Sequence, residues 1–381
     1  MTKKTRLIIL LICALFFLVI APPIVLYSLG YRIDFEQKKI VATGGIYIKA
    51  WPQPAEFYVD SKLGGKTNMF SDSVFVQNLL PKKHNILIKK EGYFSYQKTL
   101  DIKEKEVVKI EHVILFKENI PFDLLENAEN SPFKEKELDE LFFIKNGNLY
   151  KNDISNKPLL ILKNLLAFKK TENNIIWLGI DGFLYSSDVA GQADQKLSSL
   201  PLKINKKNSY KIEMVFENIF LFENDKLLIF SQKTKELQSF YDPVKNIVIS
   251  PDGQKILFYN DYEIFFSFIW QLQGYENPEK IFLNRFSEKI NECLWLNNDY
   301  VIFTIGGKIK ISETDNKNNL NIVSLPEKII ISNGTIINLA ENYLAGEGDI
   351  KGDPKIYFNQ QDKKLYIHTG DKIVVSEKIL P

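Results

Sequence analysis

Residues 246–266 read NIVISPDGQKILFYNDYEIFF, and this stretch alternates apolar runs with turn residues. Ile256 to Tyr259 and Ile264 to Phe266 flank Asn260-Asp261, which is the pattern of a β-hairpin. Upstream, Ser250-Pro251-Asp252-Gly253 has proline at the second position of a turn and Asp-Gly after it, as turn geometry favours. The stretch therefore predicts β-strands joined by short turns.

The same hairpin pattern occurs six times between residues 137 and 381. Each case joins two apolar runs through a short turn rich in Gly, Asn, Asp or Gln. The six hairpins span residues 141–150, 175–185, 219–230, 256–266, 300–311 and 355–367. Their second strands begin 34, 44, 37, 45 and 56 residues apart. Four-stranded propeller blades need about 40–50 residues each, so most of these intervals suit a propeller.

Residues 246–258 resemble the WD40-like repeat of TolB-type propellers, through the turn Ser250, Pro251, Asp252 and Gly253. Leu296 to Tyr300 has a weaker version of this turn in the next repeat. The resemblance implies a β-propeller over about residues 137–381, with five to seven blades and about six as the central value. The uneven intervals leave one alternative open, a pair of stacked β-sandwiches.

A different β-region precedes the repeats. Short alternating segments bounded by Pro and Gly predict the strands of a half-buried antiparallel sheet. These segments are 45–49, 57–60, 86–88, 107–110 and 113–115. Leu63 to Lys66 and Pro81 to Lys83 predict turns between them. The size of the region suits a small β-sandwich.

This region resembles the PEGA domain family over about residues 44–117. The resemblance rests on an opening strand that ends at Pro52, an Ala-x-φ-Tyr-φ-Asp strand, a Gly-x-Thr turn and a later Gly-Tyr pair. The motif positions are Ala55, Tyr58, Val59, Asp60, Gly65, Thr67, Gly92 and Tyr93. Pro54, Ser61, Asn68 and Lys83 depart from the family pattern. The resemblance implies a binding or structural module outside the cell or near a membrane, whose motif positions form turns and core contacts.

Residues 118–136 predict a linker between the two β-regions. The segment contains Pro121 and Pro132, and a charge run begins at Lys134. The charge run is interpreted as a solvated face.

Residues Leu7 to Leu29 form an apolar run without a charged side chain. A helix of that length rises about 34 Å, enough to cross a hydrocarbon core of about 30 Å. Lys3, Lys4 and Arg6 precede the run, which predicts a cytoplasmic N-terminus, a single-pass anchor over residues 1–30 and an extracytoplasmic remainder. The alternative is a signal peptide cleaved after Gly30, although signal h-regions are usually only about 7–15 residues long.

Charge and cysteine content exclude several classes of protein. Three of the 49 Lys and Arg precede the apolar run, so the rest of the chain contains 46 basic and 47 acidic side chains and is nearly neutral. Nucleic acid is not expected as a partner, because phosphate binding needs a concentrated basic surface. Cys13 lies in the apolar run and leaves Cys293 alone in the folded part, so no disulfide scaffold is expected.

The sequence contains no recognisable catalytic constellation, and it predicts neither cofactor nor metal. His84, His112 and His368 are far apart, and His84 is interpreted as a surface turn residue. An acidic glycine-rich loop around Gly346 to Asp349 lacks regular calcium-ligand spacing, which favours an ordinary solvated loop.

The four tryptophans divide into two groups. Trp177 and Trp295 stand in apolar triplets and are assigned to the core. Trp51 and Trp270 stay as weak candidates for binding a glycan or peptide.

Together these features predict an all-β protein of the bacterial cell envelope, held at the cell membrane by one N-terminal transmembrane helix. Its expected function is non-catalytic binding or scaffolding, in which the propeller presents loops to an envelope protein or glycan. The alternative is an envelope hydrolase with a carboxylate site on the propeller face. A sensor is disfavoured, because Met1 to Arg6 offers no output domain.

Overall fold

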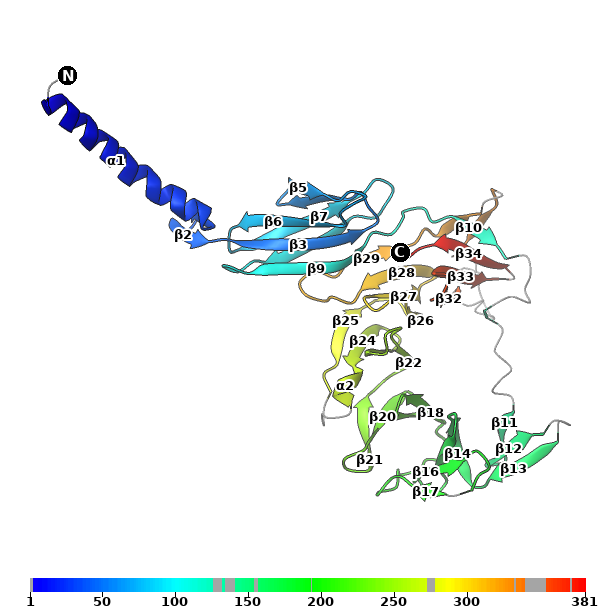
Figure 1. Cartoon of the computed structure of the whole chain (residues 1–381). Coiled ribbons are helices and arrows are strands. Elements are labelled where there is room, and N and C mark those ends of the chain that lie inside the picture. Colours follow the sequence, from blue (N-terminus) through cyan, green and yellow to red (C-terminus); the bar gives the residue numbers. More distant parts are fainter. Residues whose placement is uncertain are drawn as a thin grey trace. The chain divides into compact units, whose positions relative to one another are not determined.

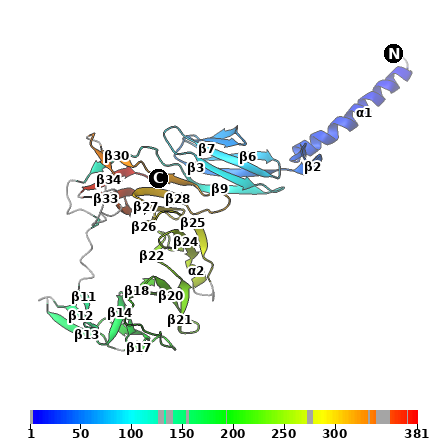
Figure 2. The same ribbon diagram turned by 180° about the vertical axis from the view of Figure 1, so that it is seen from behind.

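The structure is a computed structural model that describes residues 3–125, 132–133, 141–153, 157–192, 194–272, 278–331, 334–339, 354–370 and 372–381 (Figures 1 and 2). The chain divides into two compact units. Unit 1 comprises Met1–Ile120, Asp315–Pro326 and Lys378–Pro381, and unit 2 comprises Pro121–Thr314 and Glu327–Glu377.

Unit 1 begins with helix α1 (Lys3–Ser28), which contains the predicted apolar run. Pro22 and Pro23 lie inside the helix and do not end it. No residue of α1 is buried in the protein, and its length and composition are those of a membrane span or a signal sequence. Among the described residues it is the one helix with these properties. A short hairpin follows, made of β1 (Tyr31–Asp34) and β2 (Lys39–Ala42).

The rest of residues 44–120 forms a sandwich of two sheets, as predicted. One sheet has the order β6-β3-β9 and the other β5-β4-β7-β8. Only β3 and β9 pair in parallel. The strands are β3 (Gly44–Trp51), β4 (Glu56–Val59), β5 (Lys62–Lys66), β6 (Ser73–Leu79), β7 (Lys83–Lys89), β8 (Tyr96–Asp101) and β9 (Val107–Ile114).

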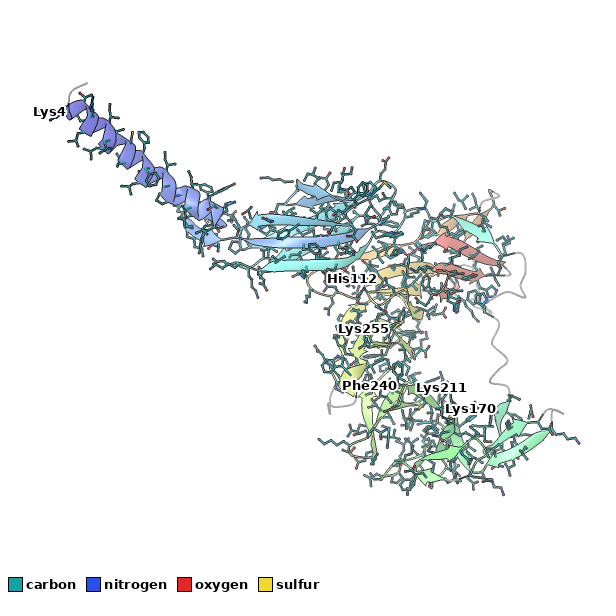
Figure 3. The ribbon with its side chains drawn as sticks, viewed as in Figure 1. Lys4, His112, Lys170, Lys211, Phe240 and Lys255 are labelled. Carbon is teal, nitrogen blue, oxygen red and sulfur yellow. The ribbon has the colours of Figure 1, made fainter. Side chains whose placement is uncertain are left out.

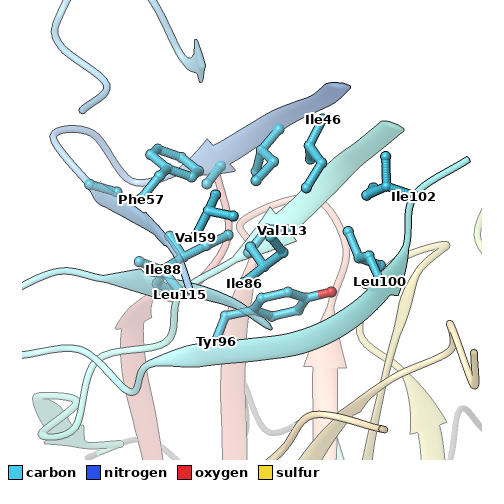
Figure 4. Close-up of a cluster of buried hydrophobic side chains, with 13 residues drawn as sticks. Ile46, Phe57, Val59, Ile86, Ile88, Tyr96, Leu100, Ile102, Val113 and Leu115 are labelled. Carbon is cyan, nitrogen blue, oxygen red and sulfur yellow. The ribbon is translucent and has the colours of Figure 1, made fainter. Parts of the chain in front are cut away.

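One side of each sheet faces a common core, because alternate residues of a strand point to opposite faces. Figure 4 shows this core, in which side chains such as Phe57, Ile86 and Ile88 are fully buried. Its members are Ile46, Ile48, Ala50, Ala55, Phe57, Val59, Ile86, Ile88, Tyr96, Leu100, Ile102, Val113 and Leu115. The motif residues Ala55 and Val59 are therefore core residues.

The turn predicted at Leu63 to Lys66 is wrong, because these residues belong to strand β5. The turn lies earlier, at Asp60 and Ser61, which have φ angles of 49° and 65°. Gly65 is needed for close packing: a Cβ on Gly65 would lie 2.5 Å from Cγ1 of Val74 in the opposite sheet. The glycine therefore lets the two sheets approach each other.

A segment from much later in the chain completes unit 1. This segment is Asp315–Pro326, which includes β29 (Ile322–Ser324). The side-chain oxygen of Asn319 accepts the backbone N–H of Thr99 at 3.0 Å. The side-chain oxygen of Asn321 accepts the backbone N–H of Gln97 at 2.9 Å. Lys98 between them is fully buried, and its Nζ contacts the carbonyl and the carboxylate of Asp315 at 2.7 and 3.0 Å. The segment thus covers the edge strand β8.

Unit 2 is a series of antiparallel sheets built in chain order. The first sheet contains β11 (Phe142–Lys145), β12 (Asn148–Asn152) and β13 (Pro158–Leu162). The second sheet contains β14 (Leu165–Lys170), β15 (Asn174–Gly179), β16 (Leu184–Asp188) and β17 (Gln195–Lys196). The third sheet contains β18 (Tyr210–Val215), β19 (Asn218–Glu223), β20 (Lys226–Ser231) and β21 (Glu236–Tyr241). The next two contain β22 (Asn246–Ile249), β23 (Lys255–Tyr259), β24 (Glu263–Phe268) and β25 (Ile281–Arg285); and β26 (Ile290–Trp295), β27 (Tyr300–Ile305) and β28 (Lys308–Glu313). A short helix, α2 (Ile269–Leu272), follows β24, and a two-stranded sheet joins β30 (Lys328–Ile330) to β31 (Ile336–Asn338).

The last sheet includes a strand from the beginning of unit 2. Its order is β10-β34-β33-β32, from β10 (Phe122–Leu124), β32 (Lys355–Asn359), β33 (Lys364–Thr369) and β34 (Lys372–Lys378). All six predicted hairpins are confirmed, as β11-β12, β15-β16, β19-β20, β23-β24, β27-β28 and β32-β33.

Neighbouring sheets of unit 2 pack face to face, which explains why the sequence shows apolar runs and little alternation. In β19, Ile219 and Leu221 face the sheet of β14 to β17, whereas Phe220 and Phe222 face the sheet of β22 to β25. Phe240, labelled in Figure 3, belongs to the second of these cores. A sheet buried on both faces by its neighbours is a propeller blade, and the stacked-sandwich alternative is wrong. The number of blades stays a prediction.

Candidate functional site

Two motif positions of unit 1 hold neighbouring strands together. The backbone N–H of Ala55 donates to Oγ1 of Thr67 at 2.8 Å, and the N–H of Thr67 donates to the carbonyl of Ala55 at 2.9 Å. Both residues are buried. These two hydrogen bonds satisfy polar groups that are buried away from water, so Ala55 and Thr67 have structural roles.

Asp60 and His84 form a partly buried polar contact that the sequence did not reveal. Oδ2 of Asp60 lies 2.7 Å from Nδ1 of His84, and Oδ1 of Asp60 accepts the backbone N–H of Asn85 at 3.0 Å. Nε2 of His84 lies 2.8 Å from the carbonyl oxygen of Leu80. His84 is buried, so its interpretation as a surface turn residue is wrong. The signal available in the sequence was the Asp of the motif, but its partner is 24 residues away.

One further motif residue, Tyr93, lines a groove in unit 1. Gly92 has a φ of 75° and supplies the carbonyl that accepts the N–H of Glu118 at 3.0 Å. The OH of Tyr58 donates to Oε2 of Glu56 at 2.9 Å. The groove has a volume of about 800 Å³, and its lining consists of Pro54, Glu56, Lys66, Lys89, Lys90, Glu91, Tyr93, Ser95 and Glu118.

Opposite charges occupy this groove side by side. Nζ of Lys66 lies 3.2 Å from Oε1 of Glu56. Nζ of Lys90 donates to the carbonyl oxygens of Gln53 and Pro54, both at 3.1 Å, and lies over the ring of Tyr93. Burial, and then the positive charge of Lys66, lowers the pKa of Lys90. The groove therefore has no excess of one charge with which to hold an ion.

The turn identified from the sequence lies between β22 and β23 in unit 2. Oγ of Ser250 donates to Oδ1 of Asp252 at 2.6 Å and accepts the N–H of Lys255 at 2.9 Å. Gly253 has a φ of 69°, and its N–H donates to the carbonyl of Ser250 at 2.9 Å. Pro251 occupies the second position. These bonds make the turn rigid.

Side chains connect this turn to the corresponding turns of neighbouring sheets. The ring of Phe216, between β18 and β19, lies against Gly253, where a Cβ would come within 2.8 Å of it. The N–H of Asp252 donates to Oδ1 of Asn298, between β26 and β27, at 3.0 Å. Nζ of Lys255, labelled in Figure 3, donates to the carbonyl of Asn298 at 2.6 Å.

The series continues to the last sheet. Nε2 of Gln360, between β32 and β33, donates to the carbonyl oxygens of Trp295 and Leu296, both at 3.3 Å. We call these four connected turns the turn face, defined by residues 216–217, 250–254, 296–299 and 360–363. The sequence indicated Ser250 to Gly253 and the slot at Leu296 to Tyr300. It held no signal for Phe216 or Gln360, because turns of this kind have no shared motif.

Two of the four tryptophans, Trp177 and Trp295, lie in the core as predicted. Trp177 and Trp295 are buried, and their Nε1 atoms donate to Oγ of Ser187 and to the carbonyl of Val248. Trp51 is half-buried at the end of β3 in unit 1, and Trp270 is exposed on α2 in unit 2. The two weak candidates thus belong to different units, and their role in binding stays a prediction.

The carboxylates of unit 2 are engaged in packing where they are buried. Burial raises the pKa of Glu292, and Oε2 of Glu292 accepts the N–H of Ile356 at 2.9 Å, which joins β26 to β32. Within the described ranges no three His, Cys, Asp or Glu side chains form a group fit for a metal ion. The acidic loop at Gly346 to Asp349 lies outside the described residues. The carboxylate site of the hydrolase alternative stays a hypothesis.

Comparison with known proteins gives two distantly similar solved structures and a family for part of the chain. The chain is similar to YCF48 from Cyanidioschyzon merolae, with 12% identity and a TM-score of 0.41 over 77% of this chain and 91% of that one. It is also similar to a structure described as YCF48 bound to D1 peptide, with 13% identity and a TM-score of 0.31 over 62% of this chain and 91% of that one. No curated protein matches the sequence. Residues 43–115 match the PEGA domain family.

Proposed function

We propose that this chain is a non-catalytic binding or scaffold protein of the cell envelope, which uses the turn face of unit 2 to bind an envelope protein or glycan. The observation that carries the proposal is the connection of four turns from four sheets by the side chains of Phe216, Asn298 and Gln360. Connected turns hold their shape before a partner arrives, which lowers the entropic cost of binding.

The composition of the turn face suits a macromolecular partner. Phe216 has 61% of its surface exposed, and exposed amide and carboxylate side chains such as Gln361 and Asp252 surround the series of turns. An exposed aromatic ring with polar neighbours is typical of the centre and rim of an interface. Backbone bonds within the sheets support the turns, because the sheets are buried on both faces.

Helix α1 anchors the protein in this proposal. Lys3, Lys4 and Arg6 keep its N-terminus in the cytoplasm, so the PEGA domain and the propeller lie outside. Residues 43–115 then lie between the anchor and the propeller along the chain. Extraction of membranes at alkaline pH tests the anchor: the chain stays with the lipid, whereas a cleaved and secreted protein is released.

Photo-crosslinking in intact cells tests the turn face. A photoreactive phenylalanine replaces Phe216 in one variant and Gln361 in a second. Leu159 is a matched control, because it is 60% exposed but lies in strand β13. We expect the same adduct from positions 216 and 361 and none from position 159. Equal adducts from all three positions, or none from the turn face, would contradict the proposal.

Two further assays separate protein, glycan and hydrolase. Sedimentation with insoluble envelope glycan detects a glycan partner, and Phe216→Ser is expected to weaken it if the turn face is responsible. Turnover of envelope glycan or peptide by the full chain would overturn the non-catalytic proposal in favour of the hydrolase.

A further inference from the structure

The hairpin of β1 and β2 presents apolar side chains to solvent beside the end of α1. Ile33 and Ile40 are directly opposite each other in the pair, so they share one face, and they are 55% and 56% exposed. Phe35 in the connecting turn is 82% exposed. Three large apolar side chains of a twelve-residue hairpin therefore lack cover within the described chain.

Hydrogen bonds fix the hairpin to the helix end. The carbonyl of Gly30 accepts both the N–H and the Oγ1 hydroxyl of Thr43, at 2.9 and 2.7 Å. Nη1 of Arg32 donates to the carbonyl of Tyr27 at 2.8 Å, and its guanidinium lies 3.5 Å from the centre of the Tyr27 ring. The Arg32 contact thus adds a second donor to the Tyr27 carbonyl in the last helical turn, which also accepts the N–H of Gly30 at 3.2 Å. The hairpin and the helix end therefore move as one element.

The charges of the hairpin favour an anionic surface. Oδ1 of Asp34 accepts the N–H groups of Glu36 and Gln37 and is turned inward, and Glu36 pairs with Lys82 at 3.0 Å. Lys38 and Lys39 are exposed, and within the described part of the chain neither forms an ion pair. Asp34 is thus held by backbone N–H groups and Glu36 is paired with Lys82, whereas Lys38 and Lys39 face solvent next to the apolar face.

We propose that this hairpin lies in the headgroup layer of the membrane, with Ile33, Phe35 and Ile40 toward the acyl chains and Lys38 and Lys39 at the lipid phosphates. The occupant follows from position, because β1 begins three residues after the end of an apolar helix long enough to span. Interfacial elements bury an apolar face about 5–10 Å deep with basic residues beside it. The inference rests on the proposed anchor and adds a second contact with lipid.

Site-specific fluorescence in vesicles tests the hairpin. The full chain with Cys13→Ser retains one native thiol, Cys293, which is fully buried. Phe35→Cys is labelled with an environment-sensitive nitrobenzoxadiazole group and reconstituted in phosphatidylcholine–phosphatidylglycerol vesicles. Phe70→Cys is the matched control, because Phe70 is fully exposed in the turn between β5 and β6. We expect blue-shifted emission and strong quenching by spin-labelled lipid at position 35, and neither at position 70.

The outcomes distinguish the hairpin from the anchor. Flotation with vesicles reports on α1, so a chain that does not float overturns both the anchor and this inference. A chain that floats while the label at position 35 stays unquenched keeps the anchor and overturns the hairpin proposal. Equal quenching at positions 35 and 70 also overturns it, since the label itself would then be seeking lipid. Lys38→Glu with Lys39→Glu is expected to reduce the quenching at position 35.

Discussion

At the scale of single residues, Asp60 shows how a motif position stabilises the PEGA domain. Burial of its carboxyl acts to raise the pKa, but hydrogen bonds from the N–H of Asn85 and from His84 act in the opposite direction. The pKa of Asp60 is lowered overall, with a smaller contribution from the charge of Lys82. The ionised carboxylate is therefore the form that the folded state prefers.

The variant Asp60→Asn is expected to lower the free energy of unfolding by about 1 kcal/mol at pH 7. The estimate is modest, because the Asp60 side chain is 46% exposed and solvent screens the contact. Asparagine tolerates the φ of 49° at this position, so the backbone is not strained. What is lost is the negative charge that faces His84.

The pH dependence of this difference follows from the sign of the shift. A carboxyl with a lowered pKa stabilises the fold fully above its unfolded pKa of about 3.9 and loses that contribution as the pH falls through the folded value. The difference in the free energy of unfolding between the wild type and Asp60→Asn should be largest near neutral pH and should disappear in acid. Urea denaturation at pH 7, 5 and 3 measures it. A gap that is constant with pH would contradict the assignment.

Lys98 and Asp315 show why a buried charge depends on its partner. Removing the carboxylate with Asp315→Ala leaves a buried cation, with an expected cost of about 2 kcal/mol. Lys98→Met leaves only a half-exposed carboxylate that water can solvate, and we expect it to cost less than about 1 kcal/mol. Thermal unfolding of both variants shows which of the two is the more destabilised. If Lys98→Met were the more destabilising, the buried ammonium would not be the cause.

At the scale of elements, strand β5 depends on the absence of a side chain at Gly65. In a strand, Gly→Ala normally stabilises by about 0.5–1 kcal/mol. Here the new Cβ meets Val74, so we expect Gly65→Ala to destabilise by about 1–2 kcal/mol. The double variant with Val74→Ala should recover part of this loss. A double-mutant cycle by urea denaturation measures the coupling, and purely additive effects would contradict the contact.

Elements of this fold are predictable from the sequence where their pattern is local. The six hairpins of unit 2 were predictable because each holds two apolar runs around a short turn, and blades buried on both faces need such runs. Leu63 to Lys66 was misassigned because Gly64-Gly65 resembles a turn in sequence. The true reason for these glycines is the approach of the other sheet, and that information is not local.

At the scale of the whole molecule, the candidate site was only partly predictable. Ser250 to Gly253 is recognisable as a turn in the sequence, but the contacts of this turn with Phe216 and Asn298 depend on which sheets are neighbours. The same limit applies to Lys98, whose partner Asp315 is 217 residues away. Contacts over such separations leave no periodic signal in a single sequence.

The pairing of β10 with β34 is the longest-range feature of this kind. In the pairing of β10 with β34, Phe122 lies opposite Ser376, Asp123 opposite Val375 and Leu124 opposite Val374. Phe122 also forms a β-bridge with Ile331. Phe122 is buried, whereas Leu124 on the same strand is 40% exposed. If β10 holds the ends of the propeller together, the side chain of Phe122 should contribute to the stability of the last sheet, and that of Leu124 should contribute little.

The variant Phe122→Ser is therefore expected to lower the free energy of unfolding by about 3 kcal/mol, because it removes a buried ring and leaves a hydroxyl in its place. Leu124→Ser, the matched control, should cost less than about 1 kcal/mol. Amide hydrogen exchange locates the effect, with faster exchange in β34 and unchanged exchange in the sheet of β18 to β21, which does not contact β10. Uniformly faster exchange across unit 2 would mean that β10 stabilises the whole propeller, whereas unchanged exchange in β34 would mean that β10 does not close it.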